Sequence, residues 1–548
     1  METITLIFFI ILAIFISGIL TRVIPFNIPL PLVQIFFGGV ISFFFDKGVP
    51  LEPHMFFLIF IPPLLFLDGW QISNFELKKE WFNIFQLSVG LVVFTMVVLG
   101  FLINFLIPGI PLAIAFALAA ILSPTDPVAV SGIAGKLPVS KRVMSVLEGE
   151  ALFNDATGLV AFKMAILVAV TGTFSTTEAV GSFIWVVSVG VITGILTTWI
   201  LYLSRKKVIQ KYGEELGSEV MLSLLIPFVS YLVAERLHAS GVLSAVASGI
   251  TMSRLELRES ANPMTRMRRT AIWDTAKFIL NGAIFVILGE QLPNIFKNSI
   301  VVASEYGYHN VFDVIFLALF ICFILIFIRF FWVVISLNLT FFIKHKYRLV
   351  LNDENLRDIF LVSLGGVRGT VTLAGVLSFP LLLPSGSTFP ARDLTILLAA
   401  TVIIISIIVA SVFIPMIVKD KVESKKQSGH DFKISKLVIE LSRSKSEESL
   451  SDLYVQFKEI DSSLGEEEYL ELVNRLWLEI EESLNLGENS EGSHSHKIII
   501  EKKVRKSIIE ATRKSIYTLA IKRDISDVEA RDMVRRLDFY DVGFNNVK

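Results

Sequence analysis

The sequence predicts an all-α, polytopic membrane protein with a small helical domain at its C-terminal end. Three features of the 548-residue chain support this fold class. The composition is 53% hydrophobic and only 18% charged, whereas ordinary soluble domains carry about 25% charged residues. Apolar runs long enough to cross a bilayer recur up to about residue 419. Beyond that point the sequence changes to dense charge with helical periodicity.

About thirteen segments reach the roughly 20 apolar residues that a membrane span requires. The first, "METITLIFFIILAIFISGILTR", lacks the basic start and the small-residue cleavage site of a removable signal, so we interpret it as a span. The cores of the thirteen segments lie near residues 4–21, 28–46, 54–69, 84–107, 110–134, 143–171, 180–204, 218–235, 239–252, 271–292, 312–343, 357–383 and 393–418.

The loops between the spans predict the orientation of the chain. Clusters of Lys and Arg, such as "SRKKVIQK" and "KHKYR", fall in every second loop from the third span onward. Basic loops face the cytoplasm. The N-terminus is therefore expected outside the cell membrane and the C-terminus in the cytoplasm, which requires an odd number of spans.

The fifth span is predicted to be broken near the middle of the membrane. In "ILSPTDPVAVSG", Pro124 and Pro127 each remove a backbone donor and bias the residue before them away from helical angles. Thr125 and Asp126 are therefore expected in a short unwound segment. Such a segment survives at that depth only where protein or water satisfies its freed backbone groups.

The twelfth span, "LVSLGGVRGTVTLAG", is predicted to be broken as well. Gly365, Gly366 and Gly369 weaken the helix, and Arg368 places a permanent cation beside them. One broken helix in each half is typical of inverted repeats, which place a substrate site near the midplane of the membrane. We therefore pair spans 1–6 with spans 8–13 and treat span 7 as a connector. The alternative is that these residues only kink helices for packing.

The sixth span carries charges that are costly within a bilayer. A charge at its centre costs at least ~2.5–3.5 kcal/mol on insertion scales, so such residues usually face a cavity or a partner. In "EGEALFNDATGLVAFKMAILVAV", Glu150 and Asn154 share one helix face and Asp155 lies one step round it. If this helix packs against the fifth, Asp126 and Asp155 approach one another and can bind either a small monovalent cation or a proton. Competition for the same oxygens amounts to exchange, provided that the site opens to one side at a time.

The arginines within the spans require acidic partners. Arg329 and Arg368 stay charged, and Glu150 is an acid that is not already assigned to ion binding. The sequence leaves open whether Glu150 pairs with Arg329 or with Arg368. Asp68, beside a Gly-Trp pair at the end of the third span, fits a helix-end residue and a functional acid equally well. Lys163 is expected to extend toward an interface; the alternative is that it pairs with an acid elsewhere.

Two domains are predicted, a transmembrane domain over residues 1–419 and a cytosolic helical tail over residues 420–548. The polar stretch "SKKQSGHDFK" links them, and "GEEEYLELVNRLWLEIEESL" has the apolar stripe of an amphipathic helix. His494 and His496 lack neighbouring Cys or carboxylate residues at ligand spacing, so they give little support to a metal site. The tail contains no phosphate loop or calcium loop, and its ligand is unknown.

Other functions fit the sequence less well. No cofactor is expected, the net charge of −1 gives no indication of nucleic-acid binding, and the single Cys322 excludes a disulfide framework. A cation channel could use the same acids, but the sequence shows no filter ring. An intramembrane aspartyl protease needs two aspartates that share a proton, and the contexts "TDP" and "FND" do not resemble that family. We therefore do not expect an enzyme.

Four motifs occur in order on these spans: "SPTDPVAV", "GEALFNDATG", "NGAIFVILG" and "LGGVRGTVTLAG". Together they resemble the monovalent cation:proton antiporter-1 family, the sodium/proton exchangers. The resemblance covers about Met1 to Val418, where "PLPLVQIFFGG" and "FIPPLLFLDGW" are similar too. The tail is similar only to the variable cytosolic tails of bacterial members.

The resemblance implies a thirteen-helix fold in which the fifth and twelfth helices cross, usually in a homodimer. Transport would resemble an elevator-like movement of one domain against another and would serve pH homeostasis. By this resemblance Asp155 binds the proton and the cation, and Asn154 is its structural companion. Thr125 and Asp126 would line the same site.

The resemblance also implies further roles. Glu150, Arg329 and Arg368 match the buried ionic network of the family, and Asp68 resembles an acid that shapes the region where cations enter. Asn154 stands before Asp155 where electrogenic relatives have a second aspartate, which implies electroneutral one-for-one exchange. The expected cation is sodium, with lithium or potassium as alternatives, including a K+/H+ exchanger that is regulated by the tail.

The sequence departs from the family pattern at two positions. Ala151 stands where some members have a serine that contacts the ion, so coordination would rely more on water or backbone groups. Asn281 occupies a position that is acidic in animal exchangers, which weakens the transfer of their pH regulation to this chain.

Overall fold

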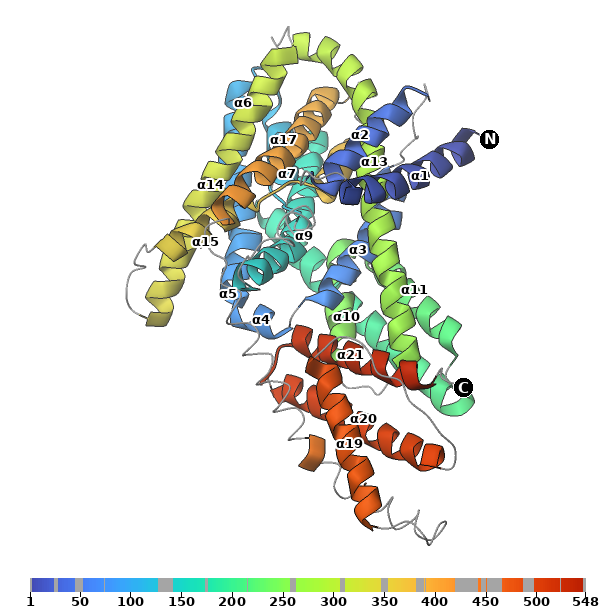
Figure 1. Ribbon diagram of the computed structural model, residues 1–548. Helices are drawn as coiled ribbons and strands as arrows, with labels where there is room; N and C mark the ends of the chain where they lie inside the picture. The colour runs from blue at the N-terminus through green and yellow to red at the C-terminus, as the bar shows by residue number, and fades with distance from the viewer. Residues whose placement is uncertain are drawn as a thin grey trace.

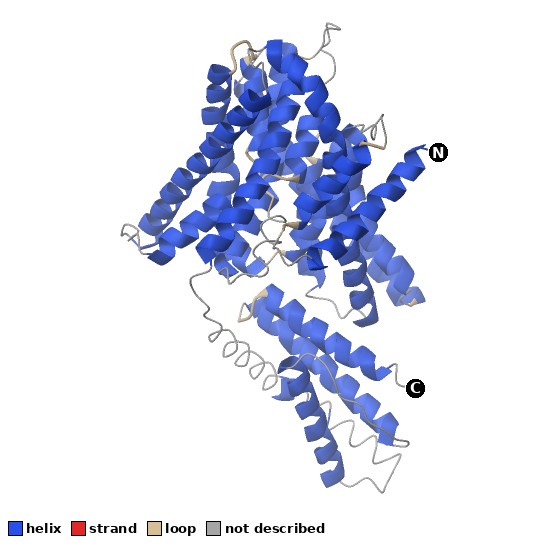
Figure 2. Ribbon diagram, turned by 45° about the horizontal axis from the view of Figure 1, so that its top comes forward, coloured by secondary structure: helices blue, strands red, loops and turns tan. Residues whose placement is uncertain are grey.

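All of the regular secondary structure in the described part of the chain is helical (Figure 2). The computed structural model describes residues 2–23, 28–44, 53–72, 74–126, 141–172, 176–213, 215–256, 263–305, 311–345, 353–380, 389, 391–418, 442–444, 450, 466–485, 497–522 and 524–545.

The first half of the membrane part begins with helices α1, α2 and α3, which are followed by the short consecutive elements α4, α5, η1 and α6. Its last helix, α9, is 31 residues long. The bounds are α1 Glu2–Val23, α2 Leu30–Ser42, α3 Pro53–Gln71, α4 Asn74–Lys79, α5 Trp81–Phe85, η1 Gln86–Gly90, α6 Leu91–Leu106, α7 Leu112–Leu122 and α9 Lys141–Thr171.

The second half of the membrane part comes next along the chain, and the helices of the tail follow it (Figure 1). The bounds are α10 Thr176–Tyr212, α11 Leu216–Arg236, α12 Gly241–Glu256, α13 Pro263–Glu305, α14 Val311–His345, α15 Asp353–Leu364, α16 Thr370–Leu377, α17 Arg392–Val418, α19 Glu466–Asn485, α20 Lys497–Lys522 and α21 Asp527–Asn545.

The protein is a polytopic membrane protein, as predicted. Within the described residues, 8 helices are long and apolar enough to cross a membrane, and the shorter apolar helices Leu30–Ser42, Leu58–Gln71 and Leu112–Leu122 lie in predicted spans. Phenylalanines such as Phe8, Phe316 and Phe323 are exposed on these helices, as expected of surfaces that face lipid. The count of thirteen stays a prediction, because several of the predicted spans are short or interrupted.

The packing of the helices has an internal symmetry. In the first half, α2 packs on α13, α1 on α13, and α7 on both α6 and α9. The counterparts in the second half are α12 on α3, α11 on α3, and α15 on α14 and α17. Each contact thus recurs with the two halves exchanged, which is the pattern of two repeats related by a two-fold axis. In this pairing α10 is the connector.

Both predicted breaks are present, and they meet. Helix α7 ends at Leu122 and residues 123–126 continue without helical structure, while residues 365–369 separate α15 from α16. The backbone N–H of Asp126 donates a hydrogen bond to the carbonyl of Val367, at 2.7 Å. Each unwound segment therefore contributes one partner to this bond. Pro127 lies outside the described residues.

The tail forms a helical unit of its own at one end of the membrane part (Figure 1). Helices α19, α20 and α21 bury a separate apolar cluster that includes Leu476, Trp477, Ile480, Ile508 and Leu537. The predicted boundary at residues 419 and 420, the linker and the two histidines lie outside the described residues. Helix α21 contacts α13 and is therefore an element that joins the tail to the membrane part.

Candidate functional site

Arg368 ties the two unwound segments together. Its Nε donates to the carbonyl of Leu122 at 3.0 Å, a second guanidinium nitrogen donates to the carbonyl of Gly366, and its backbone N–H donates to Ser406 Oγ at 3.1 Å. A cation at the C-terminal end of α7 satisfies a carbonyl that has no partner within the helix. The guanidinium of Arg368 therefore stabilises both unwound segments by donating hydrogen bonds to the backbone carbonyls of Leu122 and Gly366.

Glu150 pairs with Arg329, which settles the choice that the sequence left open. The guanidinium of Arg329 binds both carboxylate oxygens, one of them at 2.6 Å, and its Nε donates to the carbonyl of Val362 at 2.8 Å. Both side chains are at most 2% exposed. A Cβ on Gly366 would lie 2.7 Å from Cδ of Arg329, so only glycine leaves room for this arginine. The pair joins α9 to α14 and α15.

Thr125 and Asn154 extend this polar cluster toward the break in the fifth span. The amide of Asn154 donates to Thr125 Oγ1 at 2.9 Å, and Thr125 Oγ1 lies 3.4 Å from a carboxylate oxygen of Glu150. All three side chains are buried. Among the residues that the structure describes, the side-chain oxygen of Asn154 has no hydrogen-bond partner. A buried polar oxygen of this kind is costly unless it binds water or an ion.

Asp126 and Asp155 are the two acids of the predicted ion site, and both are buried, at 8% and 9% exposure. Asp126 packs directly against the second break, since a Cβ on Gly369 would lie 1.9 Å from Asp126 Oδ2. Its negative charge acts on Asp155, which lies on α9. The structure thus brings these two acids to the same crossing as Thr125 and Asn154.

Asp155 also lines a cavity of about 630 Å³. Ala151 and Leu152 line the cavity from the same helix, and so does Asp68 from α3. Because Asp155 is reached from this cavity, a cation or a proton has a route to its carboxylate. The structure places Asp68 on the wall of the same cavity as Asp155.

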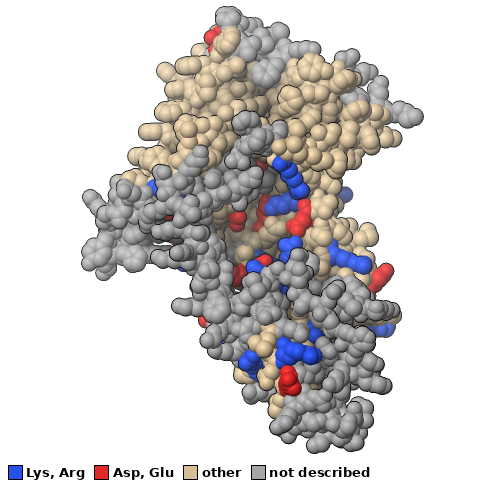
Figure 3. Space-filling view, viewed as in Figure 1, with Lys and Arg blue, Asp and Glu red and all other residues tan. Residues whose placement is uncertain are grey.

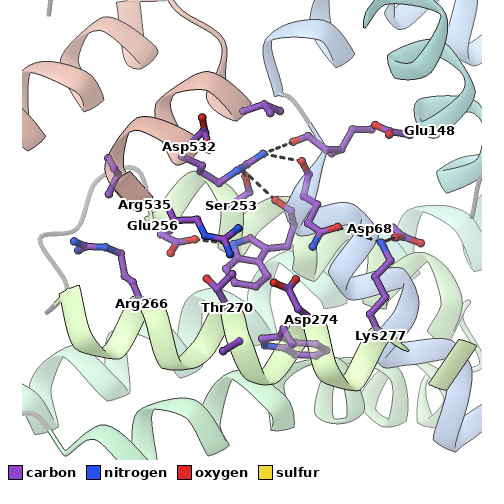
Figure 4. A pocket seen from close by; sticks show the side chains of 18 of the residues that line it. Asp68, Glu148, Ser253, Glu256, Arg266, Thr270, Asp274, Lys277, Asp532 and Arg535 are labelled. Carbon is purple, nitrogen blue, oxygen red and sulfur yellow. Dashed lines mark hydrogen bonds and ion pairs between the residues drawn. The ribbon is translucent and has the colours of Figure 1, made fainter. Parts of the chain in front are cut away.

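Lys277 is a charged residue of the cavity that the sequence did not reveal. Its ammonium group donates to Asp68 Oδ1 at 3.0 Å and to Gln71 Oε1 at 3.1 Å, within the cavity (Figure 4). Glu148, another acid, lines the same cavity as this pair. The available signal was spacing: Arg266, Thr270, Asp274 and Lys277 fall three or four residues apart, on one face of α13.

Lys163 lies away from the crossing. Its side chain is 66% exposed, as expected of a residue that extends toward an interface, but it also forms a 3.6 Å ion pair with Glu235 of α11. Lys163 is therefore a surface residue and takes no part in the site.

The oxygen groups at the crossing suit a small monovalent cation. Carboxylates, a hydroxyl and a side-chain amide are the hard ligands that such ions prefer. The described residues contain no group of three or more His, Cys, Asp or Glu that could hold a metal ion.

Comparison with known proteins agrees with this geometry. The sequence model of the sodium/hydrogen exchanger transmembrane family matches residues 10–420. The chain belongs to the sodium/hydrogen exchanger family. It is 35% identical to the uncharacterized Na+/H+ exchanger YjcE of Escherichia coli over 96% of both chains, a similarity that extends into the tail. It is 41% identical to the sodium, potassium, lithium and rubidium/H+ antiporter of Bacillus pumilus, over 74% of this chain and 60% of the other.

Among solved structures, the exchanger is similar in fold to the sodium proton antiporter MjNhaP1 from Methanocaldococcus jannaschii. The TM-score is 0.57 at 17% identity, and the similarity covers 77% of this exchanger and 99% of that chain. The arrangement of helices is therefore that of a known antiporter fold.

Proposed function

We propose that this exchanger carries a monovalent cation in one direction and protons in the other, and that both compete for the carboxylate of Asp155. The observation that carries the proposal is the place of Asp155, buried beside two crossing unwound segments and open to a cavity. Asp126, Thr125 and Asn154 supply the other oxygens. A single exchangeable carboxylate that binds either ion makes transport an obligatory exchange.

Sodium is the expected cargo, with lithium and potassium as alternatives. The names of two relatives support this range: one is a sodium, potassium, lithium and rubidium/H+ antiporter and another, from Synechocystis, is a low-affinity Na+/H+ antiporter. Asn154 is neutral and Glu150 is already paired with Arg329, which leaves few charges at the site to move with the cargo. We therefore propose electroneutral one-for-one exchange.

Alternating access would come from movement between two groups of helices. One group contains α1, α2, α3, α11, α12 and α13, and the other contains the crossing on α7 and α16 together with α9, α14 and α17. The ionic contacts of Glu150 and Arg368 lie within the second group, so it can move as a unit. We propose a homodimer in the cell membrane with the N-terminus outside and the tail in the cytoplasm, and a transporter that is not an enzyme.

The test is the loss of an imposed pH gradient in proteoliposomes that hold the purified full-length protein. Sodium, lithium and potassium are added in turn at a clamped voltage to the wild type, to Asp155→Asn and to Asp393→Asn. Asp393 is the control because it lies in the first turn of α17 and its side chain is 42% exposed. Exchange is expected in the wild type and in Asp393→Asn and is expected to be absent in a folded Asp155→Asn protein. Exchange that survives Asp155→Asn, or a voltage-driven conductance in the wild type, would overturn the proposal.

A further inference from the structure

The cavity that contains Asp155 is lined on its far side by the tail. Residues of α9 line one end, whereas Val528, Arg531 and Asp532 of α21 line the other. Figure 4 shows side chains of the tail and of α13 facing one another across this space. Charged side chains also gather in the hollow between the upper body and the lower part of the molecule (Figure 3).

Arg531 attaches α21 to the membrane part through the end of α3. Its guanidinium donates to the carbonyls of Gln71 at 2.7 Å and Trp70 at 3.2 Å, and to Ser253 Oγ of α12 at 2.9 Å. The last carbonyls of a helix lack partners within the helix and carry partial negative charge. Burial lowers the pKa of the Arg531 guanidinium. This contact includes Gln71 and lies one helical turn from Asp68. Gln71 and Asp68 are the two residues to which Lys277 donates hydrogen bonds.

Asp538 makes the second attachment. It accepts two hydrogen bonds from Arg266 of α13, one of them at 2.8 Å, and a third from Arg513 of α20 at 3.0 Å. The Asp538 side chain is 2% exposed, and the two arginines are at most 8% exposed. A buried carboxylate that accepts hydrogen bonds from two arginines is a strong and specific contact. Arg513 also lies 3.6 Å from a second acid of the tail, Asp541.

Arg531 reaches α3 and α12, and Asp538 reaches Arg266 of α13, whereas its bond to Arg513 lies within the tail. Asp155 lies on α9, in the other group of helices. The tail is therefore fixed to one wall of the cavity and faces the moving carboxylate from across it. A body so placed does not hold the two groups together. It restricts instead how ions enter the space between them.

We propose that the docked tail is a lid on the ion path, and that undocking of α21 sets the rate at which cations reach Asp155 from the side of the tail. Arg531 and Asp538 are the latch of this lid. The inference rests on the proposed exchange for its transport measurement, but a separate measurement of access does not depend on it.

Access is measured by the rate at which a hydrophilic maleimide labels a cysteine at the inner end of the cavity. Cys322 is buried, so Cys322→Ala combined with Ala151→Cys provides a single target in the full-length protein. The labelling is done in vesicles whose tail faces the bath. Arg531→Met and Asp538→Asn break the latch, Arg531→Lys keeps its charge, and Arg536→Met is the matched control, since Arg536 lies on α21 and forms an ion pair with an exposed acid in its own helix.

Both latch variants are expected to label severalfold faster than the parent, with Arg536→Met unchanged and Arg531→Lys in between. Without the cysteine changes, they are expected to raise the initial rate of cation-driven proton movement severalfold at low cation on the tail side. Unchanged labelling in folded latch variants would overturn the lid, and so would faster labelling without faster exchange. A wild type that exchanges no cation would instead refute the proposed function, and the labelling result would still decide whether the tail closes the cavity.

Discussion

One buried arginine–carboxylate cluster of this exchanger lies at the helix crossing, and another lies beneath the tail. Glu150 and Arg329 lie among the membrane helices. Asp538 joins the tail to Arg266 of α13 and also pairs with Arg513 within the tail. The chemistry is the same, but the surroundings differ. The charged groups beneath the tail can be solvated by water when α21 undocks. Those at the helix crossing lie within the membrane part, where no bulk water is available to solvate them. The first cluster therefore holds the fold together, while the second can work as a latch.

The sharpest test of this difference is to break each cluster by one substitution. Arg329→Met leaves the buried carboxylate of Glu150 without its cationic partner, which can cost ~3–5 kcal/mol. The yield of monodisperse protein and its thermal unfolding temperature in detergent are expected to fall strongly. Asp538→Asn is expected to leave both close to those of the wild type.

The double variant Glu150→Gln with Arg329→Met serves as the control. It removes both charges, so part of the yield lost in Arg329→Met should return. An equal loss of yield in Asp538→Asn and Arg329→Met would contradict the distinction between the clusters.

A smaller effect is expected where the two unwound segments touch. The Cβ of Gly369→Ala would collide with the Asp126 carboxylate, and overpacking of this kind typically costs ~1–3 kcal/mol. Because the displaced group belongs to the proposed ion site, the rate of exchange should fall more than the stability does. The measurements are thermal unfolding and dissipation of a pH gradient on the same preparation.

Gly181→Ala in α10 is the matched control for this substitution. Its Cβ would meet nothing within 4 Å, and alanine favours a helix over glycine by about 1 kcal/mol. This variant should be as stable as the wild type or slightly more stable. Normal exchange in Gly369→Ala would show that the contact with Asp126 is not required.

The smallest effect concerns the tail alone and its dependence on pH. Burial raises the pKa of Tyr469 to about 12, and its hydroxyl donates to the carbonyl of Leu450 at 2.9 Å. An unfolded tyrosine ionises near pH ~10, so the folded tail loses stability as the pH rises from that value toward 12. Tyr469→Phe should remove this part of the pH dependence.

The fluorescence of Trp477, which is buried in the same cluster, reports the change. The urea midpoint of the tail transition in the wild type should fall between pH 10 and 12 relative to that of Tyr469→Phe. Parallel curves for the two proteins would contradict the assignment.

Local chemistry is what the sequence determined by itself. Pro124 before Thr125 and Asp126, and the glycines around Arg368, weaken a regular helix wherever they lie in the fold. Both breaks therefore follow from residues that are neighbours in the chain. The sequence also identified the acidic face of α9 as a candidate site, because a charged side chain in an apolar segment is costly unless it faces a cavity or a partner.

Only the tertiary structure decided which charges meet. Lys277 and Asp68 are separated by 209 residues, and Arg531 and Ser253 by 278. Nothing in the pattern near either partner specifies the other, just as nothing selected Arg329 over Arg368 for Glu150. A local rule fixes backbone conformation because it acts between neighbours in the chain. The choice of a partner depends instead on how helices pack, and packing is decided by the whole core at once.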